Sequence, residues 1–328
     1  MKQLCVSLLI ALVFCAAQAQ NPDSIKTTLS QNDAGTIWFS SAKPLVIARE
    51  SQDASSARTP GFTLLTDQSI PLSGELAFPA GQGPFPVIVL AHGCAGIGHA
   101  DKAWVPLLRE WGYATFVVDS FRPRGFPSIC EDLRRLRPLQ RLPDVYGALN
   151  VLATHPKIDA NRIVLMGASH GGLLTLDAAT QWAKDTFASP GSRGFRAFIA
   201  MYPYCNVIAP ELKSIYAPLR IHSGELDDWT PASVCQEYVG ALKASGQAAD
   251  IQVYPAAHHA FDDPSLPVIK LPNVPSVAKC RWRGSSILES MTPEPASCIN
   301  RGVTVGYNST AAETARLNVR AQLAELLK

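Results

Sequence analysis

The chain has 328 residues, of which 47% are hydrophobic and 17% are charged, and its formal net charge is +2 at pH 7. This length and composition are typical of a globular protein with one large, well-buried core. A charge so close to neutral, with no basic stripe, argues against a nucleic-acid-binding protein. No segment after the first twenty residues is long and apolar enough to predict a membrane-spanning helix. No feature predicts an oligomeric state.

Residues 1–19 are predicted to be a signal peptide. After a positively charged start comes the apolar run Leu4–Ala16, and Ala17-Gln18-Ala19 has the small-x-small pattern that signal peptidase cleaves. The run is too short to cross a bilayer as a helix. A lipoprotein modified at Cys15 is the alternative, but bulky Phe14 stands where a small residue is expected. We therefore expect a secreted or periplasmic protein that keeps no membrane anchor after cleavage.

Residues 20–60 are predicted to form an N-terminal extension. They are polar and mixed, with a strand-like stretch at Thr36–Phe39 and a Ser/Ala-rich linker at Ser51–Thr59. From residue 61 to 328 the pattern is that of a single α/β domain. Its first element, Ile70–Phe78, is predicted to be an exposed edge strand.

Continuous apolar runs alternate with segments of helical periodicity along this domain. The runs are typical of strands buried on both faces, at Val87–Ala91, Ala114–Val118, Ile163–Met166, Phe198–Met201, Leu219–His222 and Ile251–Tyr254. Helices are expected at Ala103–Trp111, Leu139–Ala153, Gly172–Ala183, Pro231–Ala244 and Thr310–Leu327. The alternation predicts a mostly parallel central sheet with helices on both faces. Residues 264–301 fit neither period and are expected to be an insertion before the last helix.

An arginine-rich segment lies between Phe121 and Arg141. It contains six arginines against two acids, Glu131 and Asp132. We interpret it as a solvated surface that flanks a helix, and an anion-binding lid is the alternative.

The number of cysteines agrees with export. Removal of the signal peptide leaves six of the 8 cysteines, and an even number in an exported chain favours disulfides. A disulfide can join two loops that leave neighbouring strands at one edge of the sheet, and a disulfide between two cysteines of the insertion can close that segment on itself. We therefore expect the pairs Cys94–Cys130, Cys205–Cys235 and Cys280–Cys298. No Cys-x-x-Cys or His-x-x-x-His spacing occurs, and we expect neither a metal nor a cofactor.

The segment Gly167-Ala-Ser-His-Gly171 carries the strongest functional signal. A predicted buried strand runs into it and a predicted helix follows at once. This is the nucleophile-elbow pattern, in which a sharp turn raises a serine hydroxyl above the edge of the sheet. Glycines flank the serine because a side chain there would collide with the neighbouring strand or helix. The pattern predicts Ser169 as a nucleophile.

A serine nucleophile needs a base, and the base needs an acid that orients it. The loop after Leu219–His222 contains Asp227 and Asp228, and the loop after Ile251–Tyr254 contains His258 and His259. Adjacent residues of extended backbone point to opposite sides, so only one of each pair can face the serine. The residues alone leave both choices open.

Backbone N–H groups are expected to stabilise the oxyanion of such a reaction. The residue after the nucleophile, His170, can supply one, and Cys94, in the loop after the first buried strand, can supply the other. Four further residues at strand ends are candidates for substrate contacts, with a purely structural role as the alternative: His92, Arg124, Tyr202 and Trp229.

These blocks, in this order, resemble the dienelactone hydrolase family of the α/β hydrolases. The residues that carry the resemblance are His92–Gly96, Gly112-Tyr113, Val118–Phe121, Gly167–Gly172, Gly224–Asp227 with Pro231, and Tyr254–Phe261. The resemblance covers about residues 75–263 and the last helix, and implies a single domain of the α/β-hydrolase fold. In the family the acid stands three residues after the glycine and the histidine two before the phenylalanine. The resemblance therefore implies Asp227 as the acid and His259 as the base.

The chain departs from dienelactone hydrolase proper at two places. That enzyme has a cysteine nucleophile where Ser169 stands, and its carboxylate-binding arginine after the histidine has no match beside Asp262-Asp263. We therefore expect a general carboxylester hydrolase that acts on a small-molecule ester. The alternatives are a secreted peptidase or polyesterase of the same fold, and a catalytically silent binding protein. A metal site at His258-His259 with Asp262-Asp263 is not expected, because the triad already uses one of the histidines.

Overall fold

The computed structural model describes residues 25–43, 68–284 and 296–328. The predicted signal peptide, residues 1–19, and the predicted linker Ser51–Thr59 lie outside the described residues. No helix within the described ranges is long and apolar enough to cross a membrane.

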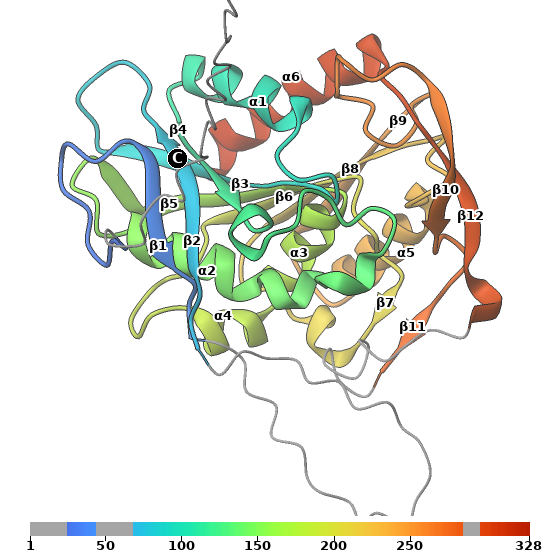
Figure 1. Cartoon of the computed structure of the whole chain (residues 1–328), viewed down its shortest axis with the longest axis horizontal. Helices are drawn as coiled ribbons and strands as arrows, with labels where there is room; N and C mark the ends of the chain where they lie inside the picture. The colour runs from blue at the N-terminus through green and yellow to red at the C-terminus, as the bar shows by residue number, and fades with distance from the viewer. Residues whose placement is uncertain (1–24, 44–67, 285–295) are drawn as a thin grey trace, which may run out of the picture.

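Eight strands form the central sheet (Figure 1), in the order β1-β2-β4-β3-β5-β6-β8-β9. They are β1 (Gly35–Ser40), β2 (Pro71–Ala77), β3 (Phe85–Ala91), β4 (Ala114–Asp119), β5 (Ile158–Ala168), β6 (Ala197–Met201), β8 (Leu219–Gly224) and β9 (Ala249–Tyr254). The pairs β1–β2 and β2–β4 are antiparallel, and every other neighbouring pair is parallel. The mostly parallel sheet is as predicted. Its parallel strands all end at one edge, where the loops after β3, β5, β8 and β9 meet.

Helices cover both faces of the sheet, as predicted. On one face lie α1 (His99–Glu110) and α6 (Ser309–Leu326), and on the other α2 (Leu142–Leu152), α3 (His170–Ala178), α4 (Gln181–Phe187) and α5 (Ala232–Ala244). Short 3-10 turns complete the helical segments: η1 (Arg122–Arg124), η2 (Leu133–Arg135), η3 (Pro138–Arg141), η4 (Pro210–Lys213) and η6 (Ala296–Cys298). Each face has its own apolar core, so the strand side chains are buried on both sides of the sheet.

Two predicted elements differ from the structure. The stretch predicted as an exposed edge strand, Ile70–Phe78, forms β2, but β1 pairs with it and takes the edge position. β1 comes from the segment that we assigned to an N-terminal extension, and it belongs to the sheet because Ile37 and Phe39 alternate into the core. The helix expected over Gly172–Ala183 is two helices, because the Thr180 side chain accepts a hydrogen bond from the N–H of Ala183 and begins α4.

The predicted insertion, residues 264–301, contains strands that the sequence pattern did not reveal, and the last of them runs on to Val305. β10 (Ile269–Ser276) and β12 (Asn300–Val305) form an antiparallel pair beside the end of β9 (Figure 1). The register shifts between Leu271 and Pro275, because proline cannot donate to the ladder. β11 (Trp282–Arg283) pairs in parallel with β7 (Val207–Ile208).

Three disulfides join the pairs that we expect from the sequence. Cys94–Cys130 connects the loop after β3 to the loop after β4, with a Cα–Cα distance of 4.8 Å. Cys205–Cys235 connects the loop after β6 to α5, and Cys280–Cys298 closes the insertion. The first of these disulfides lies at the sheet edge where the strand-end loops meet.

Candidate active site

Ser169 occupies a sharp turn between β5 and α3. Its φ of 55° and ψ of −113° lie in a region that residues with a side chain rarely adopt. A Cβ on Gly167 would overlap the carbonyl of Gly171, and a Cβ on Gly171 would overlap the carbonyl of Ala91. The two glycines therefore let α3 begin directly against β3 and β5. This packing holds the serine hydroxyl above the carboxyl edge of the sheet.

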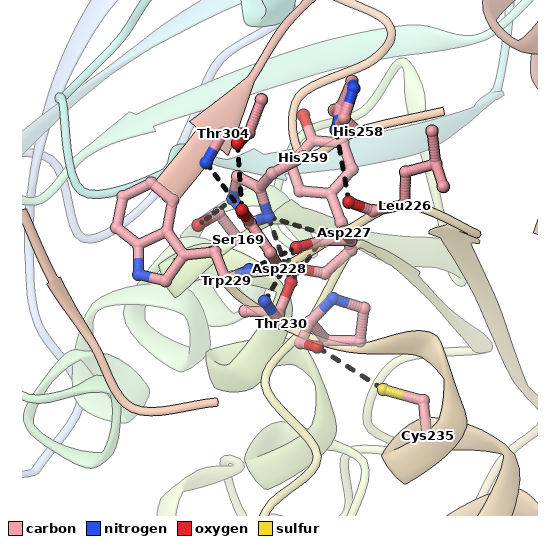
Figure 2. A network of polar contacts seen from close by, with 12 residues as sticks. Ser169, Leu226, Asp227, Asp228, Trp229, Thr230, Cys235, His258, His259 and Thr304 are labelled. Atoms are coloured by element: carbon pink, nitrogen blue, oxygen red, sulfur yellow. Dashed lines mark hydrogen bonds and ion pairs between the residues drawn. The ribbon is translucent and has the colours of Figure 1, made fainter. Parts of the chain in front are cut away.

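Ser169, His259 and Asp227 form a continuous chain of hydrogen bonds (Figure 2). His259 Nε2 lies 2.9 Å from Ser169 Oγ, and His259 Nδ1 lies 2.8 Å from Asp227 Oδ2. Both the imidazole and the carboxylate are almost completely buried. A buried carboxylate needs hydrogen-bond donors around it, and the acid loop supplies them.

The donors to Asp227 come from its own loop. Asp227 Oδ1 accepts from the backbone N–H of Trp229 at 2.9 Å and of Thr230 at 2.7 Å. The Thr230 hydroxyl lies 2.9 Å from Asp227 Oδ2, 3.0 Å from His259 Nδ1 and 3.1 Å from the carbonyl of Tyr202. These contacts fix the carboxylate and leave Oδ2 facing the histidine. Sequence reasoning missed Thr230, although an Asp followed three residues later by Thr in a strand-end loop is a pattern for such a turn.

Two aromatic rings hold the His259 ring. The ring of Tyr202 lies at 4.7 Å between centroids and the ring of Trp229 also at 4.7 Å, on buried side chains. The Tyr202 hydroxyl donates to Asp262 Oδ1 at 2.8 Å, and the Trp104 indole donates to Asp262 Oδ2 at 2.7 Å. Burial raises the pKa of the Asp262 carboxyl above its usual range. Tyr202 and Trp229 were predicted to contact substrate, and the structure places both against the histidine.

The second member of each candidate pair points elsewhere. Asp228 accepts hydrogen bonds from Thr304 and so binds strand β12. His258 points away from Ser169, with Nδ1 at 3.2 Å from the carbonyl of Leu226 (Figure 2). Of each adjacent pair, the member that belongs to the hydrogen-bond chain from Ser169 is therefore Asp227 in the first loop and His259 in the second.

The two backbone groups predicted to stabilise an oxyanion flank Ser169. A Cβ built on Gly93 would lie 3.6 Å from the Ser169 Cβ, so the loop that carries Cys94 passes beside the serine. Among the described residues, no backbone carbonyl accepts a hydrogen bond from the N–H of Cys94. His170 is the first residue of α3, where a backbone N–H has no acceptor within the helix. Neither N–H group therefore has a backbone acceptor among the described residues.

Protein groups already occupy the polar atoms of His92 and Arg124, the other two residues predicted to contact substrate. His92 is completely buried, with Nδ1 donating to the carbonyl of Gly93 at 2.8 Å and Nε2 accepting from the N–H of Ser120 at 3.3 Å. Burial holds the pKa of its imidazole well below the usual range. Arg124 forms a bidentate pair with Asp144, with both N–O distances at 2.8 Å. The described residues contain no cluster of three or more side chains suited to a metal ion.

Comparison with known proteins decides the family. A family model described as "Dienelactone hydrolase family" matches residues 72–316 of this chain. The chain belongs to the dienelactone hydrolase family. Within the described residues, that match spans every strand of the central sheet except β1, and it ends inside α6. Membership of this family supports a carboxylester hydrolase.

Three proteins that are similar to this chain share 17–24% of its residues over the matched regions. The Bradyrhizobium sp. protein "Probable 2-oxo-3-(5-oxofuran-2-ylidene)propanoate lactonase" is 22% identical over 57% of this chain and 78% of its own. The "Acylamino-acid-releasing enzyme" of Rattus norvegicus is 24% identical over 56% of this chain, which spans only 30% of the rat protein. The crystal structure of a "Putative Dienelactone Hydrolase" from Klebsiella pneumoniae subsp. pneumoniae has a TM-score of 0.54 and 17% identity, and covers 88% of this chain and 99% of its own. At that identity the structural likeness shows the fold alone.

Proposed function

We propose that this dienelactone hydrolase family member cleaves carboxylic esters of small molecules through an acyl-enzyme formed on Ser169. The observation that carries the proposal is the unbroken hydrogen-bond chain from Ser169 Oγ through His259 to Asp227, at 2.9 and 2.8 Å. An alcohol is a weak nucleophile, and this arrangement supplies the base that activates it and the acid that orients the base.

In the first half of the reaction, His259 Nε2 takes the proton of Ser169 as Oγ attacks the ester carbonyl carbon. The carbonyl oxygen becomes an oxyanion, which the N–H groups of Cys94 and His170 stabilise. When the tetrahedral intermediate collapses, the bond to the alkoxy oxygen breaks. His259 returns its proton to that oxygen, and the alcohol leaves.

In the second half, water attacks the acyl-enzyme. His259 removes a proton from the water, the oxygen adds to the acyl carbon, and the same two N–H groups hold the second oxyanion. Collapse breaks the bond to Ser169 Oγ, which takes the proton from His259. The carboxylic acid leaves and the enzyme returns to its starting state.

Asp227 keeps His259 in the tautomer that this sequence requires. With a proton on Nδ1 donated to Asp227 Oδ2, the lone pair of Nε2 faces Ser169. Tyr202 and Trp229 pack against the ring, so that rotation away from the serine is hindered.

We also propose that the protein works in an oxidising compartment, secreted or periplasmic. The three disulfides support this placement, because such bonds persist outside the reducing cytosol.

Labelling with a fluorophosphonate tests the proposed chemistry. An activated serine reacts with this probe, so the protein should gain one adduct, mapped to Ser169, and lose hydrolysis of p-nitrophenyl esters in proportion. A catalytically silent binding protein would take no label. A label on another residue would also contradict the proposal.

A peptidase is the second candidate, because the similarity to acylamino-acid-releasing enzyme reaches 24% identity. Esters and amides that share one acyl group separate the two. We expect hydrolysis of the aryl ester and little hydrolysis of the matched peptide amide, and comparable rates would favour the peptidase.

A further inference from the structure

The reaction proposed above makes no use of Arg141, the last residue of η3. The side chain is completely buried. One of its nitrogens, Nη1, donates both of its hydrogens, to the carbonyl of His92 at 3.0 Å and to His170 Nδ1 at 2.8 Å. Its other nitrogens, Nε and Nη2, have no hydrogen-bond partner among the described residues. Within the same residues Arg141 forms no ion pair.

A buried guanidinium without a carboxylate partner is costly, because it loses hydration without an ion pair in exchange. Burial lowers the pKa of Arg141 to about 10, so the side chain still carries its charge at neutral pH. The ring of Phe121, 5.1 Å from the guanidinium carbon, gives partial compensation. The presence of a buried arginine at this position is therefore not explained by a contribution to stability.

The two acceptors of Nη1 belong to the two segments that carry the proposed oxyanion donors. His92 lies two residues before Cys94, and the imidazole bound by Arg141 is that of His170 itself. The opposite nitrogen of that ring, Nε2, donates to the carbonyl of Leu136 at 2.9 Å. Burial holds the pKa of His170 well below its usual range, which keeps the ring neutral and Nδ1 free to accept. One guanidinium nitrogen thus ties both segments together.

We propose that Arg141 is a positioning residue for the oxyanion hole. Its Nη1 sets the separation of the Cys94 and His170 N–H groups, and its charge, which forms no ion pair among the described residues, favours negative charge on the oxygen between them. The inference rests on the proposed acyl-transfer function. Because that negative charge exists only in the transition states and intermediates, the loss of Arg141 should lower kcat and leave KM nearly unchanged.

The kinetic test compares Arg141→Met and Arg141→Lys with Arg220→Met. We expect Arg141→Met to reduce kcat for p-nitrophenyl acetate by roughly 100-fold, as loss of an oxyanion donor does, with KM within about threefold. Arg141→Lys keeps a charge and should recover about a tenth to a third of the activity. Arg220 is the matched control: it also bonds backbone carbonyls and pairs weakly with Glu325 at 3.8 Å, but lies near the start of β8, away from the loops.

A merely structural role predicts a different result. Arg141→Met would then have a lower melting temperature and a smaller fraction of active enzyme, as we expect for Arg220→Met. The kcat of the folded enzyme, with active sites counted by fluorophosphonate titration, would be unchanged. That outcome would overturn the inference. If Arg141→Met fails to fold, Arg141→Lys carries the same comparison, because loss of the fork geometry alone should lower kcat selectively.

A second measurement does not depend on activity. In a Ser169→Ala background, hydrogen exchange is measured by mass spectrometry over residues 92–97 and 169–173. We expect faster exchange in both segments when Arg141→Met is added, and no change there with Arg220→Met. Unchanged exchange in both segments would overturn the positioning role even if the protein proves to be an esterase. Faster exchange in a protein without esterase activity would support the positioning role and overturn the proposed reaction instead.

Discussion

Asp228 accepts two hydrogen bonds from Thr304, one from the backbone N–H at 2.7 Å and one from the hydroxyl at 2.9 Å. The carboxylate next to it, that of Asp227, faces His259 instead. Consecutive carboxylates of one loop thus have different partners, the imidazole and strand β12. Gly306, which follows β12, also reaches the histidine loop, where its N–H donates to the carbonyl of His259 at 3.0 Å. Both loops of the proposed triad are therefore held by β12 and the residue that follows it.

The division of roles between the two aspartates gives the first prediction. Asp227→Asn should lower kcat by about 10⁴-fold, because an amide in place of the carboxylate favours the wrong tautomer of His259. Asp228→Asn removes one acceptor from Thr304 and should cost less than about tenfold. Steady-state kinetics of both variants on one p-nitrophenyl ester make the comparison. A larger loss from Asp228→Asn than from Asp227→Asn would contradict the assignment.

The adjacent histidines give the second prediction. His259→Ala removes the base and should lower kcat by more than about a thousandfold, the same order as Ser169→Ala. His258→Ala is the matched control, because its ring lies on the outside of the loop beside the carbonyl of Leu226. We expect that control to keep at least a third of the wild-type kcat. Comparable losses in the two variants would argue against His259 as the base.

How far the sequence predicts this site depends on how local each signal is. Ser169 is predictable because its strand, turn and helix follow one another directly along the chain. The choice between His258 and His259 is not, because it depends on the direction that the backbone takes after β9. The resemblance to the family, rather than the pattern, supplied that choice.

Contacts between distant segments set the limit elsewhere. β1 pairs with β2 across more than thirty residues of chain, and nothing near Ile37 signals that partner. In the arginine-rich segment, Arg134 has 80% of its side chain exposed, whereas Arg141 is completely buried. We interpreted the whole segment as a solvated surface, which is wrong for Arg141. Burial there arises from packing against the loop after β3 and the start of α3, which composition does not encode.

Asp101, near the start of α1, gives the third prediction. Burial, together with the neighbouring charge of Asp262, raises the pKa of Asp101 to about 6, from 3.8. A carboxyl group with a raised pKa destabilises the folded state once it ionises. The folded protein is therefore most stable with respect to this group below about pH 4, and it loses that stability as the pH rises through 6. Asp101→Asn should therefore stabilise the protein relative to wild type by roughly 2 kcal/mol more at pH 7 than at pH 4.

Urea unfolding of wild type and Asp101→Asn at both pH values measures this difference. Asp250→Asn serves as the control of opposite sign, because a hydrogen bond from Lys243 lowers the pKa of Asp250 below its usual range. That variant should be destabilised at pH 7 and little changed in acid. If the difference in unfolding free energy between wild type and Asp101→Asn were the same at both pH values, the pKa of Asp101 would not be raised in the folded protein.

The disulfide Cys94–Cys130 gives the last prediction, which joins stability to catalysis. It encloses a sequence separation of 36 residues, and Cys205–Cys235 encloses 30. Loops of this length give similar stabilisation, about 3–4 kcal/mol by the chain-entropy estimate, so replacing either pair by alanines should lower stability equally. Only the first pair holds the loop that carries the proposed oxyanion N–H of Cys94. That loop is held further by the N–H of Ile129, which donates to the carbonyl of Cys94 at 2.9 Å.

Removal of Cys94–Cys130 should therefore lower kcat by about tenfold while KM changes little, since a displaced N–H weakens binding of the oxyanion rather than of the ester. Removal of Cys205–Cys235 should leave the kcat of the folded protein within about twofold. Kinetics at a temperature where both variants are folded, checked by circular dichroism, separate the two effects. Equal kcat values for the two variants would mean that the first disulfide stabilises the fold without tuning the site. A selective loss would mean that the disulfide helps to hold the oxyanion loop in its active position, the role that we also propose for Arg141.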